Sequence, residues 1–379
     1  MENFVAYNPV KLRFGKDVVK DLGKSVKKLG SKVLLIYGGG SVKRNGAYDE
    51  VMHSLKDTEA EVFEYSGIKS NPRISDVDKA AEIGRKNNVD VVLALGGGSV
   101  LDSAKVTALT IPVDHSGWKF LSGEAKAEKG IPIISVLTLA ATGSEMNMFA
   151  VVQNPETKQK KSVWSEYNFP RESFMDPKYT LSVPKNYTGY GIADLTAHCL
   201  EAFFGTAESS LSDRFIYSII HEAQEYGPQL MDDLQNYELR ARIMLAATYA
   251  LNGTTMIGKS GGDWGVHALG HSLSVLYDVP HGASLSIVYP AWLKFHLNTI
   301  SDRIAELGDN LFNEPNATKA IKMLESFFTS MESPIRLSDI GINGDNKQEL
   351  VNNWKQNKAG GMFYKFSGND YETLFDLML

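Results

Sequence analysis

Three of the chain's eight histidines lie within fifteen residues, at His267, His271 and His281. Imidazole is a common metal ligand, and the spacing of four between His267 and His271 puts both rings on one face if the segment is helical. His281 follows Pro280, which predicts a loop start from which a ligand can point back. Any one of these histidines is more simply a hydrogen-bonded structural residue. The spacing of the set, however, favours a metal site.

A second pair of potential ligands, Asp194 and His198, lies earlier in the chain at the same spacing of four. Such a pair alone occurs in many unrelated helices, so it gains weight only together with the histidine cluster. A carboxylate with several imidazoles suits a borderline divalent ion such as Fe(II) or Zn(II). The single cysteine, Cys199, excludes a thiolate cage and is more simply a packed thiol.

The elements that must position these residues differ between the two halves of the chain. In the first half, apolar runs of strand length alternate with segments of helical periodicity. The expected strands are residues 33–37, 61–65, 91–95 and 131–137, and the expected helices are residues 47–57, 74–88 and 99–109. This alternation predicts a doubly wound α/β fold with a mostly parallel sheet.

Two of the expected strands run directly into glycines, at residues 38–41 and 96–99. Glycines let the backbone approach an anionic group closely, and a following helix directs its free N–H groups at that group. Neither loop matches the common phosphate-loop or dinucleotide fingerprints, and tight turns are the simpler alternative. Because both loops follow strands of one sheet, they favour a variant dinucleotide-binding fold.

Beyond about Pro184 the pattern becomes helical. Long amphipathic segments cover residues 211–230, 238–251, 283–295 and 317–331, with little strand signal. We therefore predict a dinucleotide-binding domain at residues 1–184, followed by an all-α, metal-binding and catalytic domain at residues 185–379.

Composition limits the partners. The 379 residues include 39 Lys and Arg against 45 Asp and Glu, for a formal net charge of −6, which argues against nucleic acid or an anionic membrane as a partner. The N-terminus lacks the features of a signal peptide, and no apolar run approaches the roughly 18 residues of a membrane span. One cysteine agrees with a reducing compartment. We expect a cytoplasmic protein with small-molecule partners.

The chain resembles the iron-containing (group III) alcohol dehydrogenase family in four motifs and in their order, and the resemblance covers nearly the whole chain. The motifs are Gly96-Gly-Gly-Ser-Val-Leu-Asp102, Leu137-Thr-Leu-Ala-Ala-Thr-Gly-Ser-Glu145, Asp194-x3-His198 and His267-x3-His271-x9-His281. The sequence Gly38-Gly-Gly-Ser41 after the first of the expected strands is most similar to the branch of NADPH-dependent butanol dehydrogenases and aldehyde reductases. The resemblance implies a metal- and nicotinamide-dependent enzyme.

The resemblance also implies roles for individual residues. The implied metal ligands are Asp194, His198, His267 and His281, holding Fe(II) in the first instance and Zn(II) or another ion as the alternative, with His271 in proton transfer. The implied cofactor-binding residues are Gly38, Ser41, Asn71, Gly97, Gly98, Ser99, Asp102, Thr138, Thr142, Asn147 and Lys160. Lys161 is the alternative to Lys160, and Asp102 has the alternative role of supporting its loop. A homodimer is also implied.

The residues after the first of the expected strands bear on the choice of cofactor. NAD-preferring relatives place an acidic residue there to bind the ribose 2′-hydroxyl, whereas this chain has Gly38, followed by Ser41, Lys43 and Arg44. A 2′-phosphate would meet no repulsion and would find a hydroxyl and cations. We therefore predict NADP(H). If Lys43 and Arg44 only form a solvated helix face, the preference would be weak.

The predicted reaction is the interconversion of primary alcohols and aldehydes, with butanol and butyraldehyde as examples. Hydride would be exchanged with NADP(H), and the metal would act as a Lewis acid on the substrate oxygen. Phe149 and Trp264 are candidates for the wall of an alkyl pocket, with ordinary core packing as the alternative. Two other activities stay open: polyol oxidation of the glycerol dehydrogenase type, and the lyase reaction of 3-dehydroquinate synthase. The lyase would need Lys and Arg near the metal, but residues 255–281 offer only Lys259.

Overall fold

The computed structural model describes residues 1–379, and the contacts within the chain divide it into two compact units. The α/β unit comprises residues 7–183 together with residues 234–248. The helical unit comprises residues 1–6, 184–233 and 249–379. Each unit has its own core and is described by itself.

The α/β unit is built on a six-stranded sheet in which every neighbouring pair of strands is parallel. Its order is β1 (Lys11–Phe14), β8 (Glu172–Met175), β5 (Ile133–Leu137), β4 (Val91–Gly96), β2 (Lys32–Gly38) and β3 (Glu61–Ile68). The four strands expected from the sequence are β2, β3, β4 and β5. The sequence analysis missed β1 and β8 because each has only four residues and carries charged side chains such as Arg13 and Glu172.

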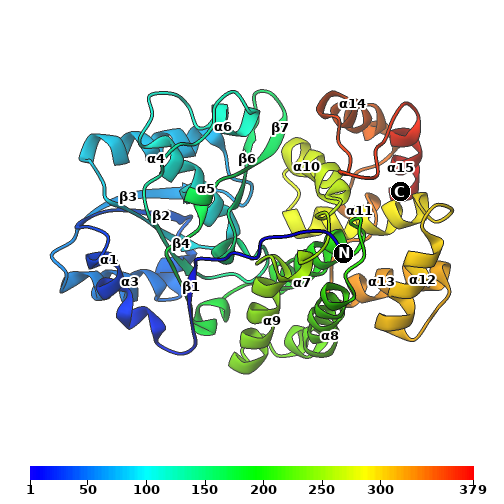
Figure 1. The fold of residues 1–379 in the computed structure, drawn as a ribbon, viewed down its shortest axis with the longest axis horizontal. Helices are drawn as coiled ribbons and strands as arrows, with labels where there is room; N and C mark the ends of the chain where they lie inside the picture. The colour runs from blue at the N-terminus through cyan, green and yellow to red at the C-terminus, as the bar shows by residue number, and fades with distance from the viewer. The chain divides into compact units, whose positions relative to one another are not determined.

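Helices cover both faces of this sheet (Figure 1). Along β2, Val33 and Leu35 pack against α1 (Leu22–Lys27) and α3 (Ala47–Lys56), and Leu34 and Ile36 pack against α4 (Ile74–Asn87) and α5 (Gly98–Thr110). Successive side chains of a strand point to opposite faces, so a strand covered on both faces must be apolar throughout. The predicted doubly wound, parallel α/β fold is therefore confirmed.

Short elements complete this unit. The helices α2 (Ser41–Arg44) and α6 (Trp118–Ser122) follow loops, and β6 (Phe149–Asn154) pairs with β7 (Gln159–Trp164) in a separate antiparallel hairpin. The sequence did not indicate the hairpin, because β7 is rich in Lys and Gln and is half-exposed along its length. Ala150 and Val152 of β6 nevertheless contribute to a small core.

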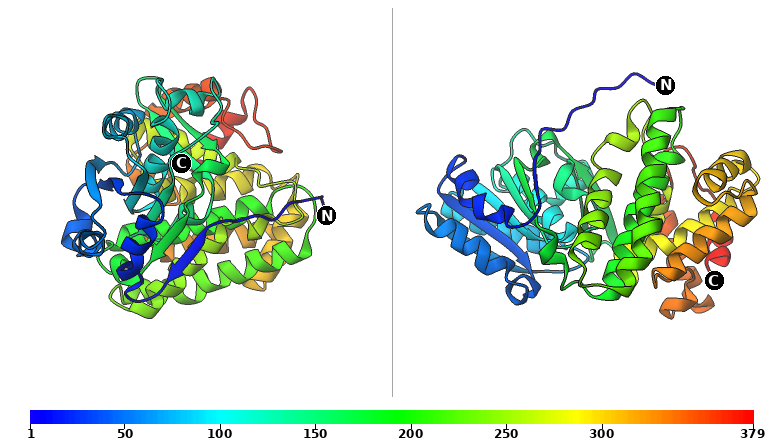
Figure 2. Two further views of the ribbon diagram at one scale, coloured as in Figure 1. Left: turned by 60° about the vertical axis from the view of Figure 1, so that its left-hand side comes forward. Right: turned by 90° about the horizontal axis from the view of Figure 1, so that it is seen from below.

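The helical unit contains no strand (Figure 2, mid-green to red). Its helices are α7 (Lys185–Phe203), α8 (Ser210–Asp232), α10 (Gly265–Tyr277), α11 (His281–Phe295), α12 (Ser301–Phe312), α13 (Ala317–Ser330), α14 (Lys347–Asn357) and α15 (Asp370–Met378). Helix α7 is buried without interruption over residues 191–203 and packs against α8 and α11. A helix buried on all sides belongs to the centre of its unit.

Helix α9 (Tyr237–Ala250) lies mostly in the α/β unit. Met244 joins the core beneath β2 and β4, and the Thr248 hydroxyl donates a hydrogen bond of 2.6 Å to Glu145 Oε1. Conversely, the first residues of the chain belong to the helical unit, where the Glu2 N–H donates to the carbonyl of Gly258. None of the helices is both long enough and apolar enough to cross a membrane.

Candidate functional site

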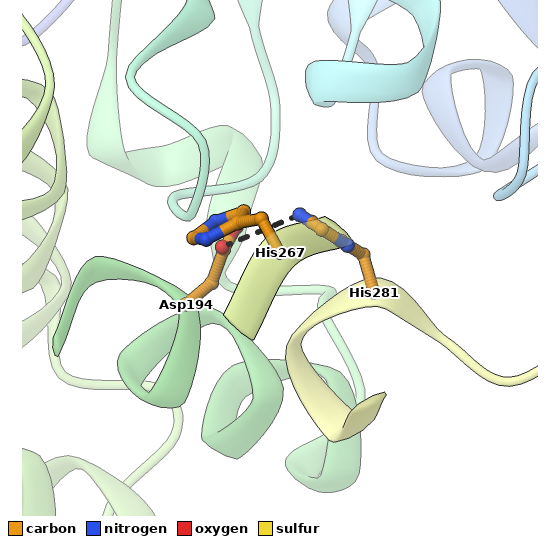
Figure 3. Close-up of side chains that lie close together, drawn as sticks. All are labelled: Asp194, His267 and His281. Atoms are coloured by element: carbon orange, nitrogen blue, oxygen red, sulfur yellow. Dashed lines mark ion pairs between the residues drawn. The ribbon is translucent and has the colours of Figure 1, made fainter. Parts of the chain in front are cut away.

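Three potential metal ligands converge in the helical unit. Asp194 comes from α7, His267 from α10 and His281 from α11, and one ligand atom of each lies within 4.8 Å of the others. Their side chains point toward one another, and Asp194 Oδ1 lies 3.8 Å from His281 Nε2 (Figure 3). Helix α7 is far from α10 and α11 in sequence, so the packing of these helices is what brings Asp194 to the two histidines.

His198 joins this group from the next turn of α7. Its Nε2 lies 3.6 Å from Asp194 Oδ1, and its ring stacks on that of His267 with centroids 4.9 Å apart. Burial, and to a lesser extent the charge of His267, holds the pKa of His198 well below its usual value. The neutral imidazole is the form that binds a metal.

The donor set fits a divalent ion. Asp194, His198 and His267 are at most 7 % exposed, whereas the His281 side chain keeps 23 % of its surface accessible. One carboxylate with three imidazoles is a nitrogen-rich set of the kind used by Fe(II) and Zn(II). The structure therefore brings together the four residues that the sequence analysis selected as metal ligands.

The sequence analysis placed His281 at the start of a loop, whereas His281 is the first residue of α11 with Pro280 at the helix N-cap. Proline occurs at the beginning of helices as well as in loops, so the sequence signal was ambiguous. The next residue, Gly282, explains how closely the start of α11 approaches α7. A Cβ at Gly282 would lie 2.0 Å from the carbonyl oxygen of Tyr190, so only glycine lets α11 approach α7 this closely.

His271 lies one turn after His267 on α10 and is half-buried. Its ring centroid is 5.7 Å from that of His281. Trp264, immediately before α10, packs its ring against His267 at 5.3 Å and His198 at 6.3 Å. The structure thus places His271 and Trp264 beside the ligand group, whereas Phe149 lies on β6 of the α/β unit and is 36 % exposed.

The second glycine loop lies where β4 ends and α5 begins. A Cβ at Gly98, the first residue of α5, would lie 2.5 Å from both Oγ1 and Cγ2 of Thr142. The Thr138 N–H donates a hydrogen bond of 3.0 Å to the carbonyl of Gly96. The loop at residues 97–99 and the predicted pair Thr138 and Thr142 are therefore neighbours, at the carboxyl ends of adjacent strands.

Two further predicted cofactor residues contact each other. Lys160 Nζ donates a hydrogen bond of 3.0 Å to Asn71 Oδ1, whereas Lys161 Nζ lies 5.9 Å from the centre of the Trp118 ring. Neighbouring side chains of a strand point to opposite faces, so β7 can present only one of these lysines on the Asn71 side. The Ser99 hydroxyl donates to the carbonyl of Ser70, which joins the Asn71 segment to the glycine loop.

Asp102 and Asn147, in contrast, make hydrogen bonds to other residues of the α/β unit. Asp102 accepts hydrogen bonds from the Ser144 hydroxyl and the Val151 N–H, and Asn147 Oδ1 accepts from Lys105 Nζ. Lys105 is fully buried, and burial lowers its pKa to about 8. These contacts agree with the alternative in which Asp102 supports the loop.

The first glycine loop separates β2 from α2. Gly40 has a φ of 106°, which favours glycine, and Ser41 and Arg44 of α2 are exposed. Lys43 Nζ lies 4.5 Å from the centre of the Tyr48 ring and 5.2 Å from that of Tyr37. Its ammonium group therefore packs on aromatic rings. This contact agrees with the alternative in which Lys43 only forms part of a helix face.

Comparisons with known proteins identify the family. The family model described as iron-containing alcohol dehydrogenase matches residues 9–177, and the model of the C-terminal part of the same family matches residues 188–375. The chain belongs to the iron-containing alcohol dehydrogenase family. The resemblance predicted from the four motifs is therefore confirmed.

Several relatives within the iron-containing alcohol dehydrogenase family are similar over most of their length. The chain is 42 % identical to a probable NADH-dependent butanol dehydrogenase 2 of Bacillus subtilis, over 93 % of this chain and 92 % of that protein. It is 33 % identical to the NADPH-dependent aldehyde reductase YqhD of Escherichia coli, over the same shares. The crystal structure of NADH-dependent butanol dehydrogenase A of Thermotoga maritima superposes with a TM-score of 0.96 at 36 % identity, over 100 % of this chain and 99 % of that one.

Membership in the iron-containing alcohol dehydrogenase family supports the predicted class of reaction, metal-dependent exchange between alcohols and aldehydes with a nicotinamide cofactor. The structure adds an observation against the lyase alternative. Lys259, the only Lys or Arg among residues 255–281, is buried in an ion pair of 2.7 Å with Asp213. The charge of Lys259 is therefore paired within the core and is not available to bind a substrate.

One further residue beside the ligands was missed by the sequence analysis. Glu201 lies on α7, and its Oε1 is 2.8 Å from His267 Nδ1. A signal was present, because residues 194, 198 and 201 are spaced by four and three and so share one face of a helix.

Proposed function

We propose that this chain is an alcohol dehydrogenase or aldehyde reductase that holds a divalent ion through Asp194, His198, His267 and His281. The observation that carries the proposal is the convergence of Asp194, His267 and His281, whose ligand atoms lie within 4.8 Å of one another on three different helices. Buried carboxylate and imidazole groups are costly to bring together, so such a cluster indicates a function beyond packing.

When bound, the divalent ion supplies Lewis acidity toward the substrate oxygen, and the nicotinamide supplies or accepts the hydride. The protein's own residues hold and shield the site. Asp194 contributes the only negative charge of the ligand set, so the set does not neutralise a doubly charged ion. Trp264 covers the rings of His198 and His267 with an apolar surface. The family's relatives named for butanol support small primary alcohols and aldehydes as substrates.

His271 is the proposed proton carrier. It lies next to His281 and is half-buried, so its ring is neither sealed in the core nor fully in solvent. Imidazole exchanges protons near neutral pH, which is what protonation of an alkoxide requires. Its position on the same helix face as His267 supports this assignment.

We further infer a preference for NADP(H). Strand β2 ends at Gly38 without an acidic side chain, and the exposed Ser41 and Arg44 follow in α2. A hydroxyl and a guanidinium suit a ribose 2′-phosphate. The relatives differ in the cofactor that their names give. The two Bacillus subtilis proteins are named NADH-dependent, whereas YqhD is named NADPH-dependent. The preference therefore rests on this chain's own residues.

The proposed function is tested by NADPH oxidation with butyraldehyde, run beside NADH. The purified protein is assayed as isolated, after metal removal, and after Fe(II) or Zn(II) is added back; we expect Fe(II) to restore the higher activity. Metal-dependent turnover with NADPH ahead of NADH would support the reaction class, the metal site and the cofactor. No turnover with any metal or either cofactor would overturn the proposed function, and faster turnover with NADH would overturn the NADP(H) preference alone.

A further inference from the structure

We infer that Glu201 is a positioning residue that fixes the His267 ring so that Nε2, and not Nδ1, faces the metal. The inference rests on the proposed metal site and extends it to a residue outside the ligand set. Glu201 Oε1 lies 2.8 Å from His267 Nδ1. In its ionised form the Glu201 carboxylate only accepts hydrogen bonds, so Nδ1 then carries the proton and Nε2 keeps its lone pair for the metal.

The same carboxylate also fixes the backbone that carries His267. Glu201 Oε1 accepts a hydrogen bond of 3.1 Å from the His267 N–H, and Oε2 accepts from the Trp264 N–H. The first N–H groups of a helix have no partner within the helix, and α10 begins at Gly265. A residue of α7 therefore caps the start of α10 and sets the rotation of its histidine with one side chain.

Helix α7 thus contributes three groups to one site. Asp194 and His198 face the metal position, and Glu201, one turn further along, reaches the ligand on the neighbouring helix. The Glu201 carbonyl also accepts a hydrogen bond of 3.1 Å from the Asp263 N–H, so both its main chain and its side chain hold residues 263–267. The position of His267 relative to the two α7 ligands then depends on α7 itself.

Burial gives this contact its strength. Glu201 is 1 % exposed and His267 is 7 % exposed, so water does not compete for their hydrogen bond. A carboxylate also increases the electron density of the imidazole that donates to it, which makes the other nitrogen a better ligand. Loss of such an outer contact typically weakens metal binding by about 10- to 100-fold.

The test compares wild type, Glu201→Gln and the control Glu225→Gln, which makes the same chemical change at an exposed position of α8. Each protein is stripped of metal and titrated with Co(II) in competition with a chelator, and the visible absorption spectrum of bound Co(II) is recorded. We expect Glu201→Gln to bind Co(II) about 10- to 100-fold more weakly with a changed spectrum, and the control to match wild type. Equal affinity and an unchanged spectrum for Glu201→Gln would overturn the inference.

A second measurement is made on the wild-type protein, so it does not depend on how Glu201→Gln folds. Zn(II)-loaded protein labelled with ¹⁵N-histidine is examined by NMR for an Nδ1–H resonance that is absent from His267→Ala. We expect His267 to be protonated at Nδ1 and metal-bound at Nε2; binding through Nδ1 would overturn the inference. Failure of wild type to retain Co(II) or Zn(II) would instead contradict the proposed metal site itself.

Discussion

The proposed metal site and the glycine loops depend on different properties of their residues. In the helical unit, side chains of α7, α10 and α11 meet, and the identity of each side chain decides whether it can bind a metal. In the α/β unit, the loop between β4 and α5 offers its backbone, and the important property of Gly98 is its missing side chain. One region works through the atoms that its residues add, and the other through the space that they leave free.

This difference has consequences for what each region tolerates. The proposed metal ligands need support from residues outside the ligand set, such as Glu201 and Gly282, because a ring must be held in position and in rotation. The loop needs support of a different kind. Asp102, Asn147 and the buried Lys105 tie α5 to the segment that follows Thr142. Substitutions in the two regions should therefore remove different functions.

The largest effect is expected for His267→Ala or Asp194→Ala, which should abolish metal retention and reduce turnover by roughly 10³-fold or more, because Lewis acidity is lost. NADPH binding should persist, since the cofactor loops belong to the α/β unit. Metal analysis and NADPH fluorescence titration measure the two properties separately. Full metal occupancy in both variants would contradict the ligand assignment, and loss of NADPH binding would show that the two regions are not separable.

The substitution Gly98→Ala should have the opposite outcome, with weaker cofactor binding and a retained metal. The new Cβ would lie 2.5 Å from two atoms of Thr142, and overpacking of this kind costs about 1–3 kcal/mol. We expect the KM for cofactor to rise by roughly tenfold or more while the metal is retained. Gly344→Ala, at an exposed glycine with nothing within 4 Å of the added Cβ, is the control. A cofactor KM equal to that of wild type would argue against a role for this loop.

A smaller change in the same unit is Gly38→Asp. An added Cβ meets only the Ile68 carbonyl at 3.4 Å and Val100 at 3.9 Å, so the fold should be kept. The carboxylate would repel a 2′-phosphate, and we expect the ratio of kcat/KM for NADPH over NADH to fall by roughly tenfold or more. Steady-state kinetics with both cofactors measure the ratio. An unchanged ratio would remove the argument for NADP(H) from this loop.

The smallest expected effect is a loss of folding stability in acid, caused by a buried histidine of the helical unit. His296 is buried among Trp292, Tyr364 and Phe366, and burial lowers its pKa to about 4. Between pH 6.5 and 4 the unfolded chain therefore binds a proton that the folded chain does not, so stability is lost as the pH falls through this window. With solvent screening allowed for, the loss is about 1–2 kcal/mol.

The His296→Gln variant tests this prediction in metal-free protein. Denaturant unfolding at pH 7 and pH 5 should show a smaller loss of stability for this variant than for wild type. His53→Gln, at an exposed position of α3 in the α/β unit, provides the control and should behave as wild type does. The same acid dependence in His296→Gln and wild type would show that other buried groups dominate.

The predictions from sequence succeeded where a pattern repeats along the chain. The alternation of β2 to β5 with α3, α4 and α5 was visible because buried parallel strands are apolar throughout and their helices are amphipathic. The pattern failed for β1, β8 and the β6–β7 hairpin. Four-residue strands and half-exposed strands rich in Lys carry too few apolar residues to be distinguished from loops.

Helix α9 illustrates a second kind of failure. A helix was expected here from the sequence, but Met244 and Thr248 direct it to the core of the α/β unit. An apolar stripe indicates that a helix packs against something without indicating what it packs against. Its assignment to a unit needs the contacts.

For the site, the residue types and short spacings already indicated the chemistry: one carboxylate and four imidazoles, with Asp194–His198 and His267–His271 at helical spacing, and glycines where strands end. These features are local, because residue type and short spacings fix which atoms a segment can offer and on which face. Three features could not be predicted in this way: Asp194, His267 and His281 meet, Lys160 and not Lys161 contacts Asn71, and Glu201 holds His267. Such meetings depend on the packing of whole helices and strands, to which every residue of the core contributes.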